Sequence, residues 1–151
     1  MCDMFEEIQP PTSSEFVFDK PFEHCNPNED YDRFCEITKI NEQRRALALF
    51  CVNLFIEGTN DSDIVFDLLN DITERFQISI KTAETKHVTD ELSEINYIVL
   101  TNLKGHLSSH ETWRDYIHQV ENITKMKQTP ENGLTSKSIF KHLDLLDAIR
   151  I

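Results

Sequence analysis

Residues 61–76 read DSDIVFDLLNDITERF, and this stretch decides the fold class. Its apolar residues recur at intervals of three and four positions: Ile64, Val65, Leu68, Leu69, Ile72 and Phe76. That spacing places them on one face of an α-helix. Thr59, Asn60 and Asp61 come just before it and offer side-chain oxygens that cap a first helical turn. We therefore expect an amphipathic helix with one buried face.

Four further segments show the same helical periodicity. Their expected limits are residues 41–57, 89–103, 109–123 and 135–149, with Thr89, Ser109 and either Thr135 or Ser136 as caps of the last three. Gly58 and Gly105 follow the first two, and glycine favours the left-handed conformation that ends many helices. Residues 76–80 alternate like a strand, but an isolated strand has no partner, so we expect a helix end or loop there. The sequence predicts an all-α fold of about five main helices, stacked as antiparallel pairs, with no substantial sheet.

The length and the charge of the chain exclude several classes of function. Its 151 residues suffice for one domain with a single core. The formal net charge of −12 argues against a broad electrostatic grip on nucleic acid or anionic lipid, which needs clustered Lys and Arg. With three glycines, the chain has no glycine-rich loop of the type that holds nucleotide phosphates. Four lysines leave RNA contact as a weak contribution at most: Lys125, Lys127, Lys137 and Lys141.

Residues 1–40 differ in composition from residues 41–151, which form the expected helical domain. The first 40 hold four of the five prolines and ten acidic residues against three basic ones, a local charge of −7. Phenylalanines are scattered through them without sustained helical spacing: Phe5, Phe16, Phe18, Phe22 and Phe34. Two interpretations are open. This acidic leader is either disordered, or extended with its aromatic rings in grooves of the domain or of a partner; residues 31–37 are compatible with a short helix that leads into the domain.

No residue pattern indicates a reaction centre, and we expect neither an enzyme nor a bound cofactor. Glu84 and His87 have the Glu-x-x-His spacing of di-iron bundles, but a second such motif is missing. His106 and His110 are four residues apart and straddle a helix end, so surface histidines are the simpler interpretation. Cys51 lies on an apolar helical face and is expected to pack in the core.

The cysteines and the apolar stretches favour a cytoplasmic protein, with a nuclear one as the alternative. The four cysteines form no CxxC pair and indicate reduced thiols. The N-terminal residues lack the basic and then apolar order of a secretory signal. The longest apolar stretch, residues 46–56, contains Asn53 and is too short to cross a bilayer, so we expect no membrane partner.

Five stretches, taken in order, carry a resemblance to a known family. Residues 41–58, NEQRRALALFCVNLFIEG, have a basic pair before an apolar helix that ends in Leu-Phe and a turn. Residues 61–69 and 97–105 are similar to the helix that follows and to the first helix of the next repeat. Residues 113–121, WRDYIHQVE, lead into residues 135–150, TSKSIFKHLDLLDAIR. The latter keep a hydroxyl pair, a basic residue, Phe and Asp-apolar-apolar-Asp in register with a closing helix. Together they resemble the C-terminal half of the middle domain of translation initiation factor 4G.

The resemblance covers about residues 41–150 and implies HEAT-like repeats, a crescent of stacked antiparallel helix pairs. It implies a non-enzymatic scaffold in mRNA translation or mRNA metabolism. The family holds both lobes of a DEAD-box helicase, initiation factor 4A. Because the acidic leader replaces the repeats for one lobe, the expected partner is the N-terminal lobe or another translation protein. The loop from residue 77 to residue 90 is expected to be longer than in the family.

The resemblance also points to four charged residues as partner-binding: Arg44, Arg45, Lys137 and Lys141. Exposed charges of this kind set the encounter and the register of two proteins. Ordinary solvation at the surface is their alternative role. The closing helix of the family has a second basic residue where this chain has Ile139, so only Lys137 matches there.

A stack cut to half its length exposes an apolar face that needs a cover. Three covers are open: the leader folded back, a second copy in a homodimer, or another protein. The functional alternative to an adaptor is a helical bundle that takes an amphipathic partner helix into a hydrophobic groove, as apoptosis regulators do. A groove lined by Trp113 and Tyr116, in place of stacked pairs, would favour that alternative.

Overall fold

The computed structural model describes residues 14–58 and 63–150, and over those ranges the chain forms helices without a strand. The main elements there are five α-helices: α1 (Tyr31–Ile56), α2 (Asp63–Ser79), α3 (Lys86–Leu107), α4 (Trp113–Thr124) and α5 (Ser136–Ile149). Two short 3-10 helices lie in the same ranges, η2 (Glu15–Phe18) and η3 (Ala83–Thr85). The predictions of an all-α fold and of five main helices are confirmed. Among the helices of these ranges, none has the length and apolar character needed to cross a membrane.

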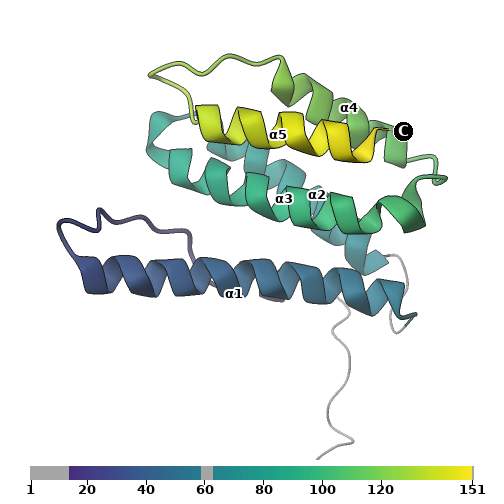
Figure 1. Cartoon of the computed structure of the whole chain (residues 1–151), viewed down its shortest axis with the longest axis horizontal. Helices are drawn as coiled ribbons and strands as arrows, with labels where there is room; N and C mark the ends of the chain where they lie inside the picture. The colour runs from purple at the N-terminus through teal and green to yellow at the C-terminus, as the bar shows by residue number, and fades with distance from the viewer. Residues whose placement is uncertain (1–13, 59–62, 151) are drawn as a thin grey trace, which may run out of the picture.

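The helices form two layers (Figure 1). α1, α3 and α5 lie side by side in one layer, and α2 and α4 lie behind α3 and α5 in the other. Consecutive helices run in opposite directions, so that α2 pairs with α3 and α4 pairs with α5. The predicted stacking of antiparallel pairs is therefore present.

The hydrophobic core is centred on α3, which packs against α1, α2 and α5. Leu92, Ile95 and Leu103 on α3 have no exposed surface. Leu145 of α5 is equally buried and belongs to the same cluster. Burying one such side chain contributes about 1.5–3 kcal/mol. Cys51 of α1 is also fully buried, which confirms its expected place in the core.

Capping groups set two helix ends as predicted. α1 ends before Gly58, whose φ of +77° lies in the left-handed region that glycine favours. α5 follows Thr135, whose hydroxyl oxygen accepts a hydrogen bond from the backbone N–H of Ser138 at 2.9 Å. The Ser138 hydroxyl in turn accepts one from the Thr135 N–H at 3.1 Å, which completes a capping box. The caps predicted at residues 59–61 lie outside the described residues.

Both predicted ends of α3 are wrong. The helix begins at Lys86, and Thr89 is a buried residue inside it rather than its cap. The Thr89 hydroxyl lies 2.9 Å from the Ser79 hydroxyl, so it bonds α3 to the end of α2. The helix also continues past Gly105, because Leu107 is only 4% exposed and its burial adds to the core.

The connection between α2 and α3 is short, contrary to the long loop expected over residues 77–90. α2 continues to Ser79, which confirms the expectation that residues 76–80 are a helix end and not a strand. Gly133, from the connection between α4 and α5, donates its N–H to the backbone oxygen of Ile80 at 2.9 Å. A Cβ at this glycine would lie 1.9 Å from the Ser79 oxygen, so such a close approach requires glycine.

The chain just before α1 is part of the folded domain. α1 begins at Tyr31, so the expected domain boundary after residue 40 lies inside this helix. Asp30 caps it, because its side chain accepts a hydrogen bond from the backbone N–H three residues later at 3.0 Å. Val17 and Phe18 of η2 are 2% and 9% exposed and join the core. Of the three covers considered, the structure contains the described part of the leader, residues 14–30, folded back onto the helices.

Candidate functional site

Arg44, expected at the surface, is buried with 2% of its area exposed. Its Nη2 donates to the backbone oxygens of Lys20 at 2.8 Å and Pro21 at 3.0 Å. Nη1 donates to Asn41 Oδ1 at 2.7 Å, and the guanidinium carbon lies 4.0 Å from the centre of the Phe22 ring. The prediction of an exposed Arg44 is wrong, because carbonyls and a ring of the leader surround its charge.

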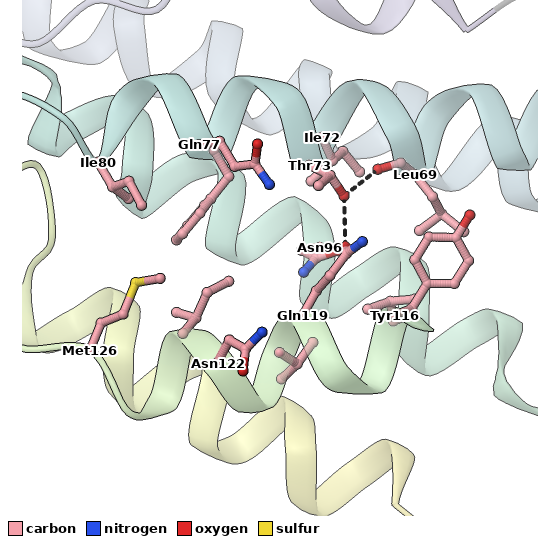
Figure 2. Close-up of a pocket in the computed structure, with 14 residues that line it drawn as sticks. Leu69, Ile72, Thr73, Gln77, Ile80, Asn96, Tyr116, Gln119, Asn122 and Met126 are labelled. Carbon is pink, nitrogen blue, oxygen red and sulfur yellow. Dashed lines mark hydrogen bonds between the residues drawn. The ribbon is translucent and has the colours of Figure 1, made fainter. Parts of the chain in front are cut away.

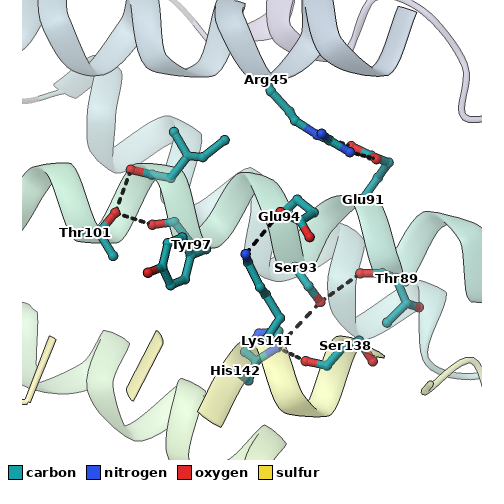
Figure 3. Close-up of polar contacts among 11 residues, drawn as sticks. Arg45, Thr89, Glu91, Ser93, Glu94, Tyr97, Thr101, Ser138, Lys141 and His142 are labelled. Atoms are coloured by element: carbon teal, nitrogen blue, oxygen red, sulfur yellow. Dashed lines mark hydrogen bonds and ion pairs between the residues drawn. The ribbon is translucent and has the colours of Figure 1, made fainter. Parts of the chain in front are cut away.

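Arg45 and Lys141 are partly exposed, and each is paired with α3 (Figure 3). Arg45 Nε donates to Glu91 Oε2 at 3.0 Å, and this hydrogen bond raises the pKa of Arg45. Lys141 Nζ lies 3.3 Å from Glu94 Oε2 and 4.2 Å from the centre of the Tyr97 ring. The two charges thus join α1 and α5 to the central helix.

Lys137 is exposed, and its side chain forms no hydrogen bond or ion pair with another described residue. Phe140 and Asp144 follow it at three and seven positions, the spacing of one helical face. Phe140 is 64% exposed and Leu143 is 41% exposed. We name these four residues, Lys137, Phe140, Leu143 and Asp144, the α5 outer face. It combines an apolar centre with one charge of each sign.

His142, on the inner side of α5, is fully buried. Its Nδ1 donates to the backbone oxygen of Ser138 at 2.8 Å and lies 3.5 Å from Ser93 Oγ (Figure 3). The Phe76 ring packs against the imidazole, with 5.0 Å between ring centres. Burial lowers the pKa of His142, so the ring is neutral at pH 7 and fills the core.

The histidines considered as metal ligands pack against other rings. The ring centres of His87 and His24 are 4.3 Å apart, and those of His110 and Phe66 are 5.0 Å apart. Within residues 14–58 and 63–150, no group of three or more His, Cys, Asp or Glu side chains is arranged to hold a metal ion. Burial raises the pKa of Cys51 to about 12, so its thiol is not activated as a nucleophile.

A groove between α2 and α4 was not predicted from the sequence (Figure 2). Its inner pocket has a volume of about 130 Å³. Apolar side chains of α2, α3 and α4 line this pocket: Leu69, Ile72, Phe76, Leu100, Val120 and Ile123. Ile80 and Met126 lie at one end of it. The inner pocket is therefore a largely apolar recess between two helices that are not consecutive.

Polar side chains stand around this apolar lining. A hydrogen bond of 3.0 Å between the Thr73 hydroxyl and the Gln119 carboxamide crosses the groove (Figure 2). Gln77, Asn96 and Asn122 also line the inner pocket. Their carboxamides form no hydrogen bond with a described residue, so their donors and acceptors are free to bind a ligand.

An outer pocket adjoins the inner one at Tyr116 and Gln119, which line both. Its other lining residues are Phe66, Asn70, Thr112 and Asp115. The Asp115 carboxylate is exposed and forms no ion pair within the described part of the chain. Burial, and to a smaller extent the charge of Asp115, raise the pKa of Tyr116, so its phenol is protonated at pH 7. We name the two pockets together the α2–α4 groove.

One sequence signal did point to the α2–α4 groove. Asn96 stands four residues after Leu92 and four before Leu100, in the middle of the buried face of α3. A carboxamide at such a position needs a polar partner or solvent, and the opening between α2 and α4 supplies solvent. The opening depends on the distance between α2 and α4, which are not consecutive helices. Hydrophobic periodicity in the sequence does not predict that distance.

Comparisons with protein-family models, with curated proteins and with solved structures returned no match to this chain. Two surfaces of the described chain are accessible to a ligand or a partner: the α5 outer face and the α2–α4 groove.

Proposed function

We propose that the chain is a non-enzymatic adaptor that binds another protein in mRNA translation or mRNA metabolism. The α5 outer face carries this proposal, because Phe140 is 64% exposed between apolar and charged neighbours. A patch that combines exposed apolar side chains with a polar rim is typical of the centre of a protein–protein interface. α5 is also the last helix of its layer, so a partner has free access to this face (Figure 1).

The stacked antiparallel pairs support the same proposal, since the resemblance to the middle domain of initiation factor 4G implies this arrangement. Residues 135–150, the best match in that resemblance, include the whole α5 outer face. The proposed partner is the N-terminal lobe of initiation factor 4A, a DEAD-box helicase, or another translation protein in the cytoplasm. RNA contact contributes little, because Lys141 is already paired with Glu94.

A regulator that binds an amphipathic helix fits the geometry less well. Trp113, expected to line its groove, is 3% exposed. It is the first residue of α4, which begins later than the predicted cap at Ser109 because residues 108–112 form turns. Tyr116 does line the α2–α4 groove, but a bound helix inserts three or four side chains and the inner pocket of about 130 Å³ is too small for them.

A pull-down with the isolated N-terminal lobe of initiation factor 4A tests the proposal. We expect the wild-type chain to bind the lobe with a dissociation constant below about 100 μM, which corresponds to a binding free energy of about −5.5 kcal/mol. Phe140→Ala and Lys137→Glu are expected to weaken binding at least about fivefold, since they remove the apolar centre and reverse a charge of the α5 outer face. Lys39→Glu is the matched control, because Lys39 is an exposed lysine on α1.

Two results would count against the proposal. Absence of binding at about 100 μM removes this helicase as the partner. Equal loss of binding in Lys137→Glu and Lys39→Glu means that overall charge, and not the α5 outer face, determines the interaction.

A further inference from the structure

The inner pocket of the α2–α4 groove has room for one apolar side chain. Its volume is about 130 Å³. An apolar cavity of about 150 Å³ in another protein holds one benzene molecule, so a leucine or phenylalanine side chain fits a space of this size. The pocket opens between the α2 and α4 side chains shown in Figure 2, which gives a partner side chain a way in.

The outer pocket has the chemistry of a site for a positive charge. The Asp115 carboxylate stands beside the rings of Phe66 and Tyr116 in the lining of this pocket. A carboxylate attracts an ammonium or guanidinium group, and an aromatic face adds a cation–π contribution. No described basic side chain is paired with Asp115, so its charge is free to bind a ligand.

The charge around the groove favours the same kind of ligand. Asp67, Asn70, Glu74 and Gln77 form one stripe along α2 at intervals of three and four residues. Asn70 and Gln77 line the two pockets, which places the exposed Asp67 and Glu74 beside the groove. Neither carboxylate is paired with a described basic residue. In a chain with a net charge of −12, these carboxylates favour a basic segment over an acidic one.

The free carboxamides indicate that the ligand is extended rather than helical. Gln77, Asn96 and Asn122 each offer N–H donors and a carbonyl acceptor at the inner pocket. The backbone of an extended peptide has unpaired N–H and C=O groups that such carboxamides bind in pairs. In a helix, the backbone N–H and C=O groups are already hydrogen-bonded to each other, so they are not available to these carboxamides.

We propose that the α2–α4 groove binds an extended segment of a partner protein, with an apolar side chain in the inner pocket and a lysine or arginine at Asp115. This inference rests on the proposed protein-binding function but uses a surface separate from the α5 outer face. Ile123 and Asp115 are eight residues apart on α4, or about 12 Å at about 1.5 Å per residue. An extended chain advances about 3.3 Å per residue, so the two side chains are about three to four residues apart.

Nuclear magnetic resonance with synthetic peptides tests this proposal on the full chain. The probe is an octapeptide with one leucine and one arginine separated by two serines, made in both orders. We expect the side-chain amide signals of Gln77, Asn96, Gln119 and Asn122 to shift on titration of the ¹⁵N-labelled chain. Replacing leucine by alanine, or arginine by serine, in the peptide is expected to raise the dissociation constant at least about fivefold.

Two protein variants locate the two pockets. Asp115→Lys reverses the charge of the outer pocket and is expected to weaken binding at least about tenfold. Asp32→Lys makes the same charge change at an exposed position of α1, outside both proposed binding surfaces, and is expected to leave peptide binding unchanged. Asn122→Trp places a large ring at the rim of the inner pocket and is expected to abolish the dependence on leucine. Thermal unfolding of each variant checks that it is folded, which is expected because all three positions are exposed.

The proposal is overturned if neither peptide, added to about 2 mM, shifts the side-chain amide signals of the groove residues. A titration to that concentration detects dissociation constants in the millimolar range. Equal effects of Asp115→Lys and Asp32→Lys on peptide binding also overturn it. Binding of the helicase lobe to Asp115→Lys separates this inference from the proposed function. If the helicase lobe binds Asp115→Lys as well as it binds the wild type, and the peptides bind neither protein, only the groove inference fails. If the peptides bind and the lobe does not, only the proposed helicase partner fails.

Discussion

Arg44 binds the leader to α1 through hydrogen bonds to the backbone oxygens of Lys20 and Pro21, so Arg44→Ala tests that packing directly. The variant loses hydrogen bonds to the backbone oxygens of Lys20 and Pro21 and to the side chain of Asn41. A hydrogen bond from a charged group contributes about 1.5–3 kcal/mol, but Lys20 and Pro21 are exposed and their oxygens regain water. Loss of the contact with the Phe22 ring costs about 1 kcal/mol more. Part of this cost is offset because folding of the variant no longer buries a guanidinium group. We expect the free energy of unfolding to fall by about 3 kcal/mol in total.

Two measurements report this loss. Urea unfolding followed by circular dichroism gives the free energy of unfolding. In thermal unfolding, a loss of about 3 kcal/mol lowers Tm by about 6–12 °C in a domain of this size. Hydrogen exchange is expected to become faster in residues 16–24 because the leader detaches more often. Arg44→Lys keeps the charge without the forked donor geometry, so we expect a smaller loss of about 2 kcal/mol.

Lys137→Ala is the control for this series, because an exposed lysine without a partner changes stability by about 0.5 kcal/mol or less. An Arg44→Ala variant as stable as this control would refute the role of Arg44 in holding the leader. Unchanged hydrogen exchange in residues 16–24 would refute it as well.

Three further predictions rest on single contacts. Gly133→Ala places a methyl group 1.9 Å from a backbone oxygen and is expected to cost at least about 2 kcal/mol in urea unfolding, whereas Gly105→Ala, with open space in α3, is neutral or stabilising. Thr135→Ala removes the cap of α5 and is expected to cost about 1 kcal/mol in the same assay. Burial lowers the pKa of His142 and of His87 in the folded chain, so the unfolded chain binds more protons below about pH 6.5. The free energy of unfolding is therefore expected to fall as the pH drops from 7 to 5.5, and His142→Gln to reduce that slope.

Each of these predictions has a contrary outcome. Equal stability of Gly133→Ala and Gly105→Ala would contradict the close packing of the α4–α5 connection against the end of α2. If Thr135→Ala is as stable as the wild type, the capping box contributes nothing. A free energy of unfolding that stays constant between pH 7 and pH 5.5 would contradict a buried, neutral His142.

The features that the sequence predicted correctly are local ones. The three-and-four spacing that identified α2 needs only the chain's own helical period, and the residues it named are buried. Gly58 and Thr135 also act on backbone groups within a few positions of themselves. Such signals are complete within one element, so they do not depend on how the elements pack.

The features that the sequence did not predict depend on contacts between distant residues. Arg44 is buried because carbonyl oxygens 24 and 23 positions earlier accept its hydrogen bonds, and nothing near Arg44 in the sequence indicates this. Thr89 looked like a helix cap, but its hydroxyl bonds to Ser79 at the end of the preceding helix. Its hydroxyl suits either role, and only the packing of α2 on α3 decides between them.

The α2–α4 groove belongs to the same class of feature. Its two walls come from helices that are separated by the whole of α3, and their distance follows from how α4 packs on α5. Asn96 is a residue whose polar type conflicts with its position on an apolar helical face. Such a conflict between a residue and the local pattern is expected where a surface has a function.

The proposed adaptor role is tested most directly by titrating the ¹⁵N-labelled chain with the unlabelled N-terminal lobe of initiation factor 4A. Backbone amide signals report which surface the lobe contacts. We predict that the signals of Lys137, Phe140, Leu143 and Asp144 shift first and saturate below about 100 μM. A titration to that concentration in which these four signals do not move would contradict the proposed role of the α5 outer face.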